Sequence, residues 1–193
     1  MSVEELSRLA DQYKVRPLAN FVLEDKRFPL WSGSSKSYQH HYGKGGLCRH
    51  TLEVVELCLL NNKFFDKIGK GVNEQSLFLA ALFHDSGKMW DYTPLDADYK
   101  DWQGNEHKRQ IHHISRSGLL WHDAVHKAGM FLSEHDTVLH AILAHHGLRE
   151  WGSPVAPATR LAWLLHLCDG MSARIDDCDS LDLFGKQVIK GMK

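Results

Sequence analysis

One segment constrains the fold more than any other: residues 76–88 read SLFLAALFHDSGK. Asn73 and Glu74 mark a helix start just before it, and the helix is predicted to continue to about Lys88. Because the segment is apolar nearly all round, it should lie buried at the centre of the molecule. The sequence therefore predicts a fold arranged around one central helix.

The same helix carries two side chains that resist burial, His84 and Asp85. Placing an imidazole and a carboxylate side by side in an apolar interior costs free energy unless something compensates for both. A bound cation would do so. Taken alone, the pair favours a buried ion pair or a helix-terminal cap over a metal site.

Helical periodicity recurs along the rest of the chain, whereas alternating strand patterns are scarce. Further helices are predicted over residues 3–13, 46–61, 110–129, 133–146 and 158–177, with loops at 28–46, 94–106 and 152–157. The chain has no internal repeat and no clear linker. Residues 1–193 are therefore predicted to form a single all-α domain, an orthogonal helical bundle.

The charge balance excludes a global basic field that would hold a long nucleic acid, because 23 Lys and Arg face 24 Asp and Glu. A local basic patch or a small nucleotide substrate stays open. No apolar stretch approaches the roughly 20 residues that span a bilayer. The N-terminus, MSVEELSRLADQYK, lacks the basic start and apolar run of a signal peptide. We expect a cytoplasmic protein with no membrane partner.

Histidine is over-represented, with fourteen in 193 residues. Five predicted helices each offer one or two nitrogen or oxygen ligands beside apolar stretches, which is how helical bundles build metal sites. The positions are His50, His84-Asp85, His112-His113, His145-His146 and Asp169. A lone histidine on an apolar face is usually a satisfied core residue, but here the combination recurs. A mixed His and Asp set favours Mn, Fe, Zn, Ni or Co over Ca.

The order H…HD…H…HH…D resembles the HD-domain superfamily of metal-dependent phosphohydrolases, over about residues 28–177. Four segments are similar to YhaM-type 3′–5′ exoribonucleases: HHYGKGGLCRHTLEVV, LFHDSGK, HHISRSG and AHHGLREWGSPVAPATRLAWLLHLCDGMSA. The chain departs from that family in two ways. His112 stands where the family tends to have Gly, and there is no room for the OB-fold nucleic-acid module that precedes the HD domain. The catalytic type is therefore expected to carry over better than the RNA substrate.

The resemblance implies one or two divalent transition-metal ions and a set of ligands for each. One ion would be held by His50, His84, Asp85 and Asp169, and a second by His113, His145 and His146, with Asp85 bridging the two. If a single ion binds, the second trio would instead face the substrate or support the first set. Lys88 shares a predicted helical face with His84 and Asp85. The resemblance implies that Asp85 and Lys88 are the catalytic residues, with Lys88 contacting phosphate or positioning water. A lysine that extends to solvent from the helix end is the alternative.

Four further residues are candidates for substrate contact. Arg49 and Arg116 are possible phosphate ligands, and a solvated surface charge is the alternative for each. His41 lies in the loop that is near the site in YhaM-like chains. Trp151 could stack on a base, or it could simply hold its loop on the core.

Hydrolysis of a phosphoester is the leading hypothesis, with a nucleotide or the 3′ end of a short single-stranded nucleic acid as substrate. A nucleoside or deoxynucleoside triphosphate hydrolase and a cyclic-nucleotide hydrolase are alternatives within that chemistry. A non-catalytic HD module that binds metal or nucleotide is the alternative outside it. Oligomer formation is possible on this sequence.

Overall fold

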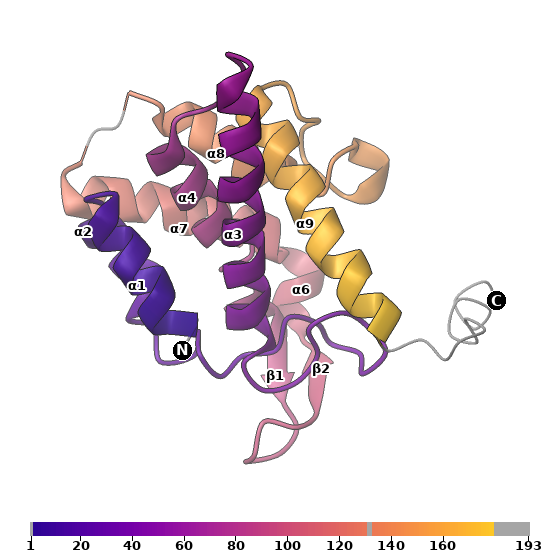
Figure 1. Cartoon of the computed structure of the whole chain (residues 1–193). Coiled ribbons are helices and arrows are strands. Elements are labelled where there is room, and N and C mark those ends of the chain that lie inside the picture. Colours follow the sequence, from indigo (N-terminus) through magenta and orange to yellow (C-terminus); the bar gives the residue numbers. More distant parts are fainter. Residues whose placement is uncertain (1, 131–132, 180–193) are drawn as a thin grey trace.

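The computed structural model describes residues 2–130 and 133–179. Its helices gather around α4, and one small β-hairpin lies at one end (Figure 1). The elements are α1 (Ser2–Gln12), α2 (Arg16–Leu23), α3 (Gly46–Lys67), α4 (Glu74–Phe83), α5 (Lys88–Asp91), β1 (Tyr92–Pro94), β2 (Trp102–Gly104), α6 (Glu106–Gln110), α7 (His113–Ala128), α8 (His135–Ala144), the 3-10 turn η1 (Arg149–Trp151) and α9 (Arg160–Asp179). The predicted all-α class is confirmed. No helix in this part of the chain combines the length and the apolarity needed to cross a membrane.

The central helix is α4, as the sequence predicts. All its residues from Ser76 to Phe83 are buried, and it contacts α2, α3, α7, α8 and α9. The side chain of Asn73 caps its N-terminus, accepting a hydrogen bond from the backbone N–H of Ser76 at 2.8 Å. Each fully buried Leu or Phe contributes roughly 1.5–3 kcal/mol, so this helix anchors the core.

Two long helices, α3 and α9, lie side by side and run in opposite directions (Figure 1). Both contact α4, and α8 packs against α4 and α9. On the other side, α1 contacts α2 and α3, and α2 contacts α7. The C-terminal ends of α4 and α8 and the N-terminal end of α7 come together near Asp169, in the middle of α9.

The central helix ends earlier than predicted. It stops at Phe83 rather than continuing to Lys88, and the residues between them form a turn. Ser86 Oγ donates to the carbonyl of Phe83 at 2.8 Å, which competes with continued helix. Gly87 lies so close to α7 that a Cβ added to it would be 2.2 Å from the carbonyl oxygen of His113. The turn therefore brings His84 and Asp85 against the first residue of α7.

Two other predictions need correction between β1 and α7. The segment 94–106 is not wholly loop, because Tyr92 pairs with Gly104 and Pro94 with Trp102 in an antiparallel hairpin. The predicted helix 110–129 begins later, at His113, because His112 has a φ of +67°, outside the helical region. The short helix α6 before it, which shares only Gln110 with the predicted range, was not predicted. α2 was not predicted, and α3 continues six residues beyond the predicted end at Asn61, to Lys67.

Candidate metal centre

The predicted ligands come together at the ends of helices. His84 and Asp85 follow α4, His113 begins α7, and His145 follows α8. His146 directly follows His145, while His50 lies within α3 and Asp169 within α9. The ends of three helices and the interior of two long ones thus supply every predicted ligand.

A first cluster consists of His50, His84, Asp85 and Asp169, with ligand atoms within 4.8 Å of one another. His50 Nε2 lies 3.1 Å from Asp169 Oδ1 and 3.2 Å from Asp85 Oδ2. His84 Nε2 lies 3.2 Å from His50 Nε2. Such a mixed nitrogen and oxygen set is able to hold a divalent metal ion.

A second cluster consists of His113, His145 and His146, whose nitrogens also lie within 4.8 Å of one another. His113 Nε2 and His146 Nε2 are 3.3 Å apart. This cluster adjoins the first through Asp85, whose Oδ1 lies 3.4 Å from His113 Nε2 and 3.6 Å from His145 Nε2.

The carboxylate of Asp85 is placed between the clusters, with Oδ2 facing the first and Oδ1 facing the second. Asp85 Oδ1 and His145 Nε2 are buried and have no hydrogen-bond partner. Buried polar atoms are rarely left unsatisfied, and each one calls for an explanation. A cation between these two atoms would satisfy both, so the residues present fit a metal ion.

Four of the histidines are oriented in the same way. His84 and His145 each donate from Nδ1 to the carbonyl three residues earlier, Ala81 and Ile142, at 2.7 Å. His50 Nδ1 pairs with Ser172 Oγ at 3.1 Å. His113 Nδ1 pairs with a carboxylate oxygen of Asp91 at 3.1 Å. Holding Nδ1 in this way leaves Nε2 directed at the centre, as metal-binding histidines require.

Opposite charges at the centre outweigh the effect of burial. Burial by itself would lower the pKa of His84, but the carboxylates of Asp85 and Asp169 raise that pKa to about 10. Burial would raise the pKa of Asp85, yet Lys88 and His84 hold it well below its usual range. Lys88 Nζ lies 2.5 Å from Asp85 Oδ2. Without a cation, the centre therefore retains a proton on His84.

In the second cluster, the pKa values of His113 and His146 are lowered rather than raised. Burial lowers the pKa of His113 to about 4, although the carboxylate of Asp91 opposes the shift. Burial, followed by the proximity of His145 and His113, also strongly lowers the pKa of His146. The imidazoles of His113 and His146 are therefore neutral near pH 7, which is the form that binds metal.

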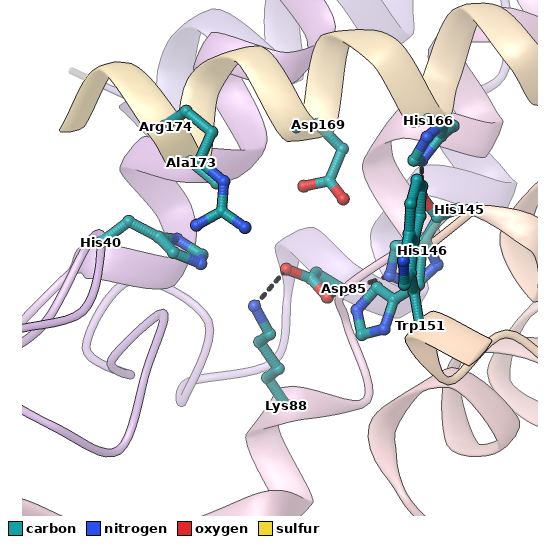
Figure 2. A pocket seen from close by; sticks show the side chains of 11 residues that line it. His40, Asp85, Lys88, His145, His146, Trp151, His166, Asp169, Ala173 and Arg174 are labelled. Atoms are coloured by element: carbon teal, nitrogen blue, oxygen red, sulfur yellow. Dashed lines mark hydrogen bonds and ion pairs between the residues drawn. The ribbon is translucent and has the colours of Figure 1, made fainter. Parts of the chain in front are cut away.

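A cavity of about 470 Å³ opens onto both clusters. Figure 2 shows Asp169 and Arg174 reaching into it from α9, with Lys88 on the opposite side. Its lining is otherwise made of histidines, one carboxylate, one tryptophan and small residues. These are His40, Asp85, His145, His146, Trp151, His166, Gly170 and Ala173.

The predicted substrate residues divide into two groups. Trp151 lines the cavity and stacks on His166, with ring centroids 5.9 Å apart. Arg49 donates to the carbonyl of Lys44, and Arg116 donates from Nε to His107; neither lines the cavity. His41 is turned away from the cavity, since its Nε2 lies 2.8 Å from a carboxylate oxygen of Glu53.

Sequence reasoning ranked His40 below His41 for substrate contact, and it missed Arg174 and Asp91. His40, beside the predicted His41, is the one that lines the cavity, and Arg174 is a second cation there. Asp91 accepts hydrogen bonds from the backbone N–H of His113 and from the His107 ring. Arg174 lies five residues after Asp169, which is not a same-face spacing on a helix, and no local pattern singles out Asp91.

The model of the HD domain family matches residues 47–174, more than half of the chain. The chain therefore belongs to the HD domain family. Both clusters able to hold a metal ion lie within the matched residues.

Several similar proteins carry the name 3′–5′ exoribonuclease YhaM. The one from Geobacillus sp. (strain WCH70) is 26% identical over 166 residues, which is 86% of this chain and 48% of the relative. The one from Listeria welshimeri is 32% identical over 147 residues, 74% of this chain and 43% of the relative. The chain thus spans about half the length of the curated relatives it matches. No solved structure matches it significantly.

Proposed function

We propose that this chain is a phosphohydrolase that cleaves a phosphoester at the 3′ end of a short single-stranded nucleic acid, or in a nucleotide. The observation that carries the proposal is the position of Asp85. Its two carboxylate oxygens face two separate histidine clusters, and Oδ1 has no partner of its own. One carboxylate shared by two ligand sets is suited to a two-metal hydrolytic site.

His50, His84, Asp85 and Asp169 would hold one ion, and Asp85 would be shared with a second set. That second set is His113, His145 and His146. The chemistry of these donors favours Mn, Fe, Co, Ni or Zn. Bound ions would supply the Lewis acidity that lowers the pKa of water and stabilises charge on phosphoryl oxygens.

The chain itself supplies positive charge and a stacking surface around the reacting group. Lys88 is buried and ion-paired with Asp85, so it fixes the orientation of that carboxylate and adds a cation beside it. Arg174 reaches into the cavity from α9 (Figure 2), where a guanidinium can bind a phosphate with two hydrogen bonds. Trp151 at the edge of the cavity offers a ring on which a base could stack.

The cavity volume of about 470 Å³ lies within the range of small-molecule sites. It suits one nucleotide, either free or as the last unit of a strand. Similarity to proteins named 3′–5′ exoribonuclease favours the end of a strand. Residues 1–193 would form one HD domain that carries the whole site.

The decisive experiment incubates a 5′-labelled short RNA with the purified chain and Mn²⁺. Stepwise shortening from the 3′ end is expected, and Asp85→Asn should abolish it. Asp98→Asn is the matched control, because Asp98 is an exposed acid in the hairpin loop, where it pairs with Lys100.

Two other results would redirect the proposal. An intact RNA, with release of phosphate from nucleoside triphosphates or opening of cyclic nucleotides, would assign the site to small nucleotides. Metal binding that depends on Asp85 without hydrolysis of any of these substrates would support a non-catalytic module and overturn the enzyme proposal.

A further inference from the structure

Large apolar side chains are exposed in an unusual concentration on α3 and α9. Among the described side chains, eight of the fourteen exposed large hydrophobic ones lie on these two helices or directly after α3. Leu60 is 66% exposed and Leu167 is 58% exposed. Scattered single exposed apolar residues are ordinary, but a contiguous group marks an interaction surface.

The spacing of these side chains makes a continuous stripe on α9. Trp163, Leu167, Met171 and Ile175 recur every four residues, so they lie on one face of that helix. Leu60 and Phe64 are likewise four residues apart on α3. Because the two helices lie side by side (Figure 1), the two rows form one surface, which we call the α3/α9 face.

Two hollows between the helices show that the rows adjoin. One, of about 180 Å³, is lined by Phe65 of α3 together with Trp163 and Leu167 of α9. The other, of about 400 Å³, is lined by Leu60 of α3 together with Ile175 of α9. Apolar side chains of a second protein surface could fill both.

The charges along α3 indicate which surface fits. Leu60 lies midway between Glu53 and Lys67, seven residues from each, and all three are exposed. Glu56 and Lys63 are exposed in the same way, one on each side of Leu60. Between Glu53 and Lys67, the exposed row on α3 is therefore acidic at one end, apolar in the middle and basic at the other end, with Arg49 one turn before Glu53. Such a row is complementary to its own copy laid antiparallel.

We propose that the α3/α9 face joins two copies of this chain through a two-fold axis near Leu60. In that arrangement Glu53 faces Lys67 of the partner subunit, and Glu56 faces Lys63 of the partner subunit. The apolar rows of both copies are buried between these charges. A two-fold interface uses the same patch on both subunits, which is what a self-complementary row provides.

Sedimentation velocity and light scattering over a wide range of concentration test the pairing. The unaltered chain is expected to be a dimer, and Leu60→Glu a monomer with an unchanged circular dichroism spectrum. Leu119→Glu is the matched control, because Leu119 is 51% exposed on α7, outside the α3/α9 face; it should remain dimeric. A dimer that persists in Leu60→Glu would overturn the proposal.

Charge reversal tests the register. Glu56→Lys and Lys63→Glu should each raise the dimer dissociation constant by about tenfold, because each places like charges opposite one another. Mixing the two variants should restore dimerisation, since every facing pair is then of opposite sign. Failure of the mixture to associate would overturn the two-fold arrangement.

A chain that is monomeric at every concentration would also overturn the proposal. The α3/α9 face would then be left to residues 180–193 of the same chain or to a different protein. Protection of Met171 from oxidation in such a monomer would point to the chain's own residues.

Discussion

At the scale of single residues, the orientation of each imidazole matters as much as its presence. His113 is held by Asp91, which accepts from both its backbone N–H and its Nδ1 at 3.0 and 3.1 Å. The same carboxylate pairs with His107 at 2.8 Å. Asp91 is fully buried, so water does not compete for its hydrogen bonds, and they hold the ring of His113 in one orientation.

Replacing Asp91 by Asn should therefore weaken metal binding at the second cluster. Loss of a carboxylate that orients a metal-ligating histidine lowers affinity roughly 10- to 100-fold. Titration calorimetry with Mn²⁺ or Zn²⁺ measures the effect, and Asp98→Asn serves as the exposed control. Unchanged affinity in Asp91→Asn would show that His113 does not depend on this contact.

The pKa of His84 makes metal binding depend on pH. Its raised pKa of about 10 means that the metal-free chain carries a proton there at neutral pH. A metal ion must displace that proton, so affinity should decrease as pH falls, by about tenfold per pH unit for one proton. Calorimetry in buffers of different ionisation enthalpy counts the protons released. Affinity that stays constant between about pH 6 and pH 8 would contradict this coupling.

The residues that sequence reasoning found are those whose burial is physically costly. His84, Asp85 and Asp169 stand in strongly apolar segments, so composition alone marks them as exceptional. The choice between His40 and His41 could not be made in that way. It depends on a loop in which His41 has a φ of +52° and turns toward Glu53, a contact between residues twelve positions apart.

At the scale of elements, the turn between α4 and α5 brings Asp85 to α7. The turn is possible because Gly87 has no side chain where it meets the backbone of His113. Gly170, in α9 beside Asp169, is a glycine with no such neighbour, since an added Cβ would meet nothing within 4 Å. The two positions therefore allow a matched comparison.

Gly87→Ala and Gly170→Ala should change stability in opposite directions. The first forces the turn away from α7 and should lower the free energy of unfolding by roughly 1–3 kcal/mol. The second replaces glycine inside a helix and should raise it by roughly 0.5–1 kcal/mol. Urea unfolding of both variants checks the signs. A stable Gly87→Ala protein would mean that the close approach to His113 is not required.

Periodicity predicted the long helices well because each buries one face over several turns. It could not predict β1 and β2. Each strand has only three residues, β1 includes Pro94 and β2 includes Gly104, so there is no alternation to detect. Nor could it place the break at His112, since the residues on both sides favour helix. The early end of α4 follows from the local hydrogen bond between Ser86 and Phe83 and from the packing of Gly87 against α7, and only the second is not encoded in the local sequence.

At the scale of the whole molecule, the centre keeps opposing charges inside an otherwise apolar bundle. Asp85 and Lys88 are buried, and His84 is fully enclosed. Because the ligands come from α3, α4, α7, α8 and α9, an ion bound there would link most of the fold. Metal occupancy and folding are therefore expected to be coupled.

Metal removal should consequently lower the stability of the whole chain. A ligand that binds only the folded state stabilises it by about 2.7 kcal/mol at a concentration one hundred times its Kd. For a chain of this size, that corresponds to a rise in Tm of roughly 5–10 °C. Scanning calorimetry of chelator-treated protein, with and without added Mn²⁺, measures the shift, and Asp85→Asn should show little or none. An equal shift in that variant would place the stabilising ion outside the two clusters, and a Tm indifferent to metal would remove the link between occupancy and folding.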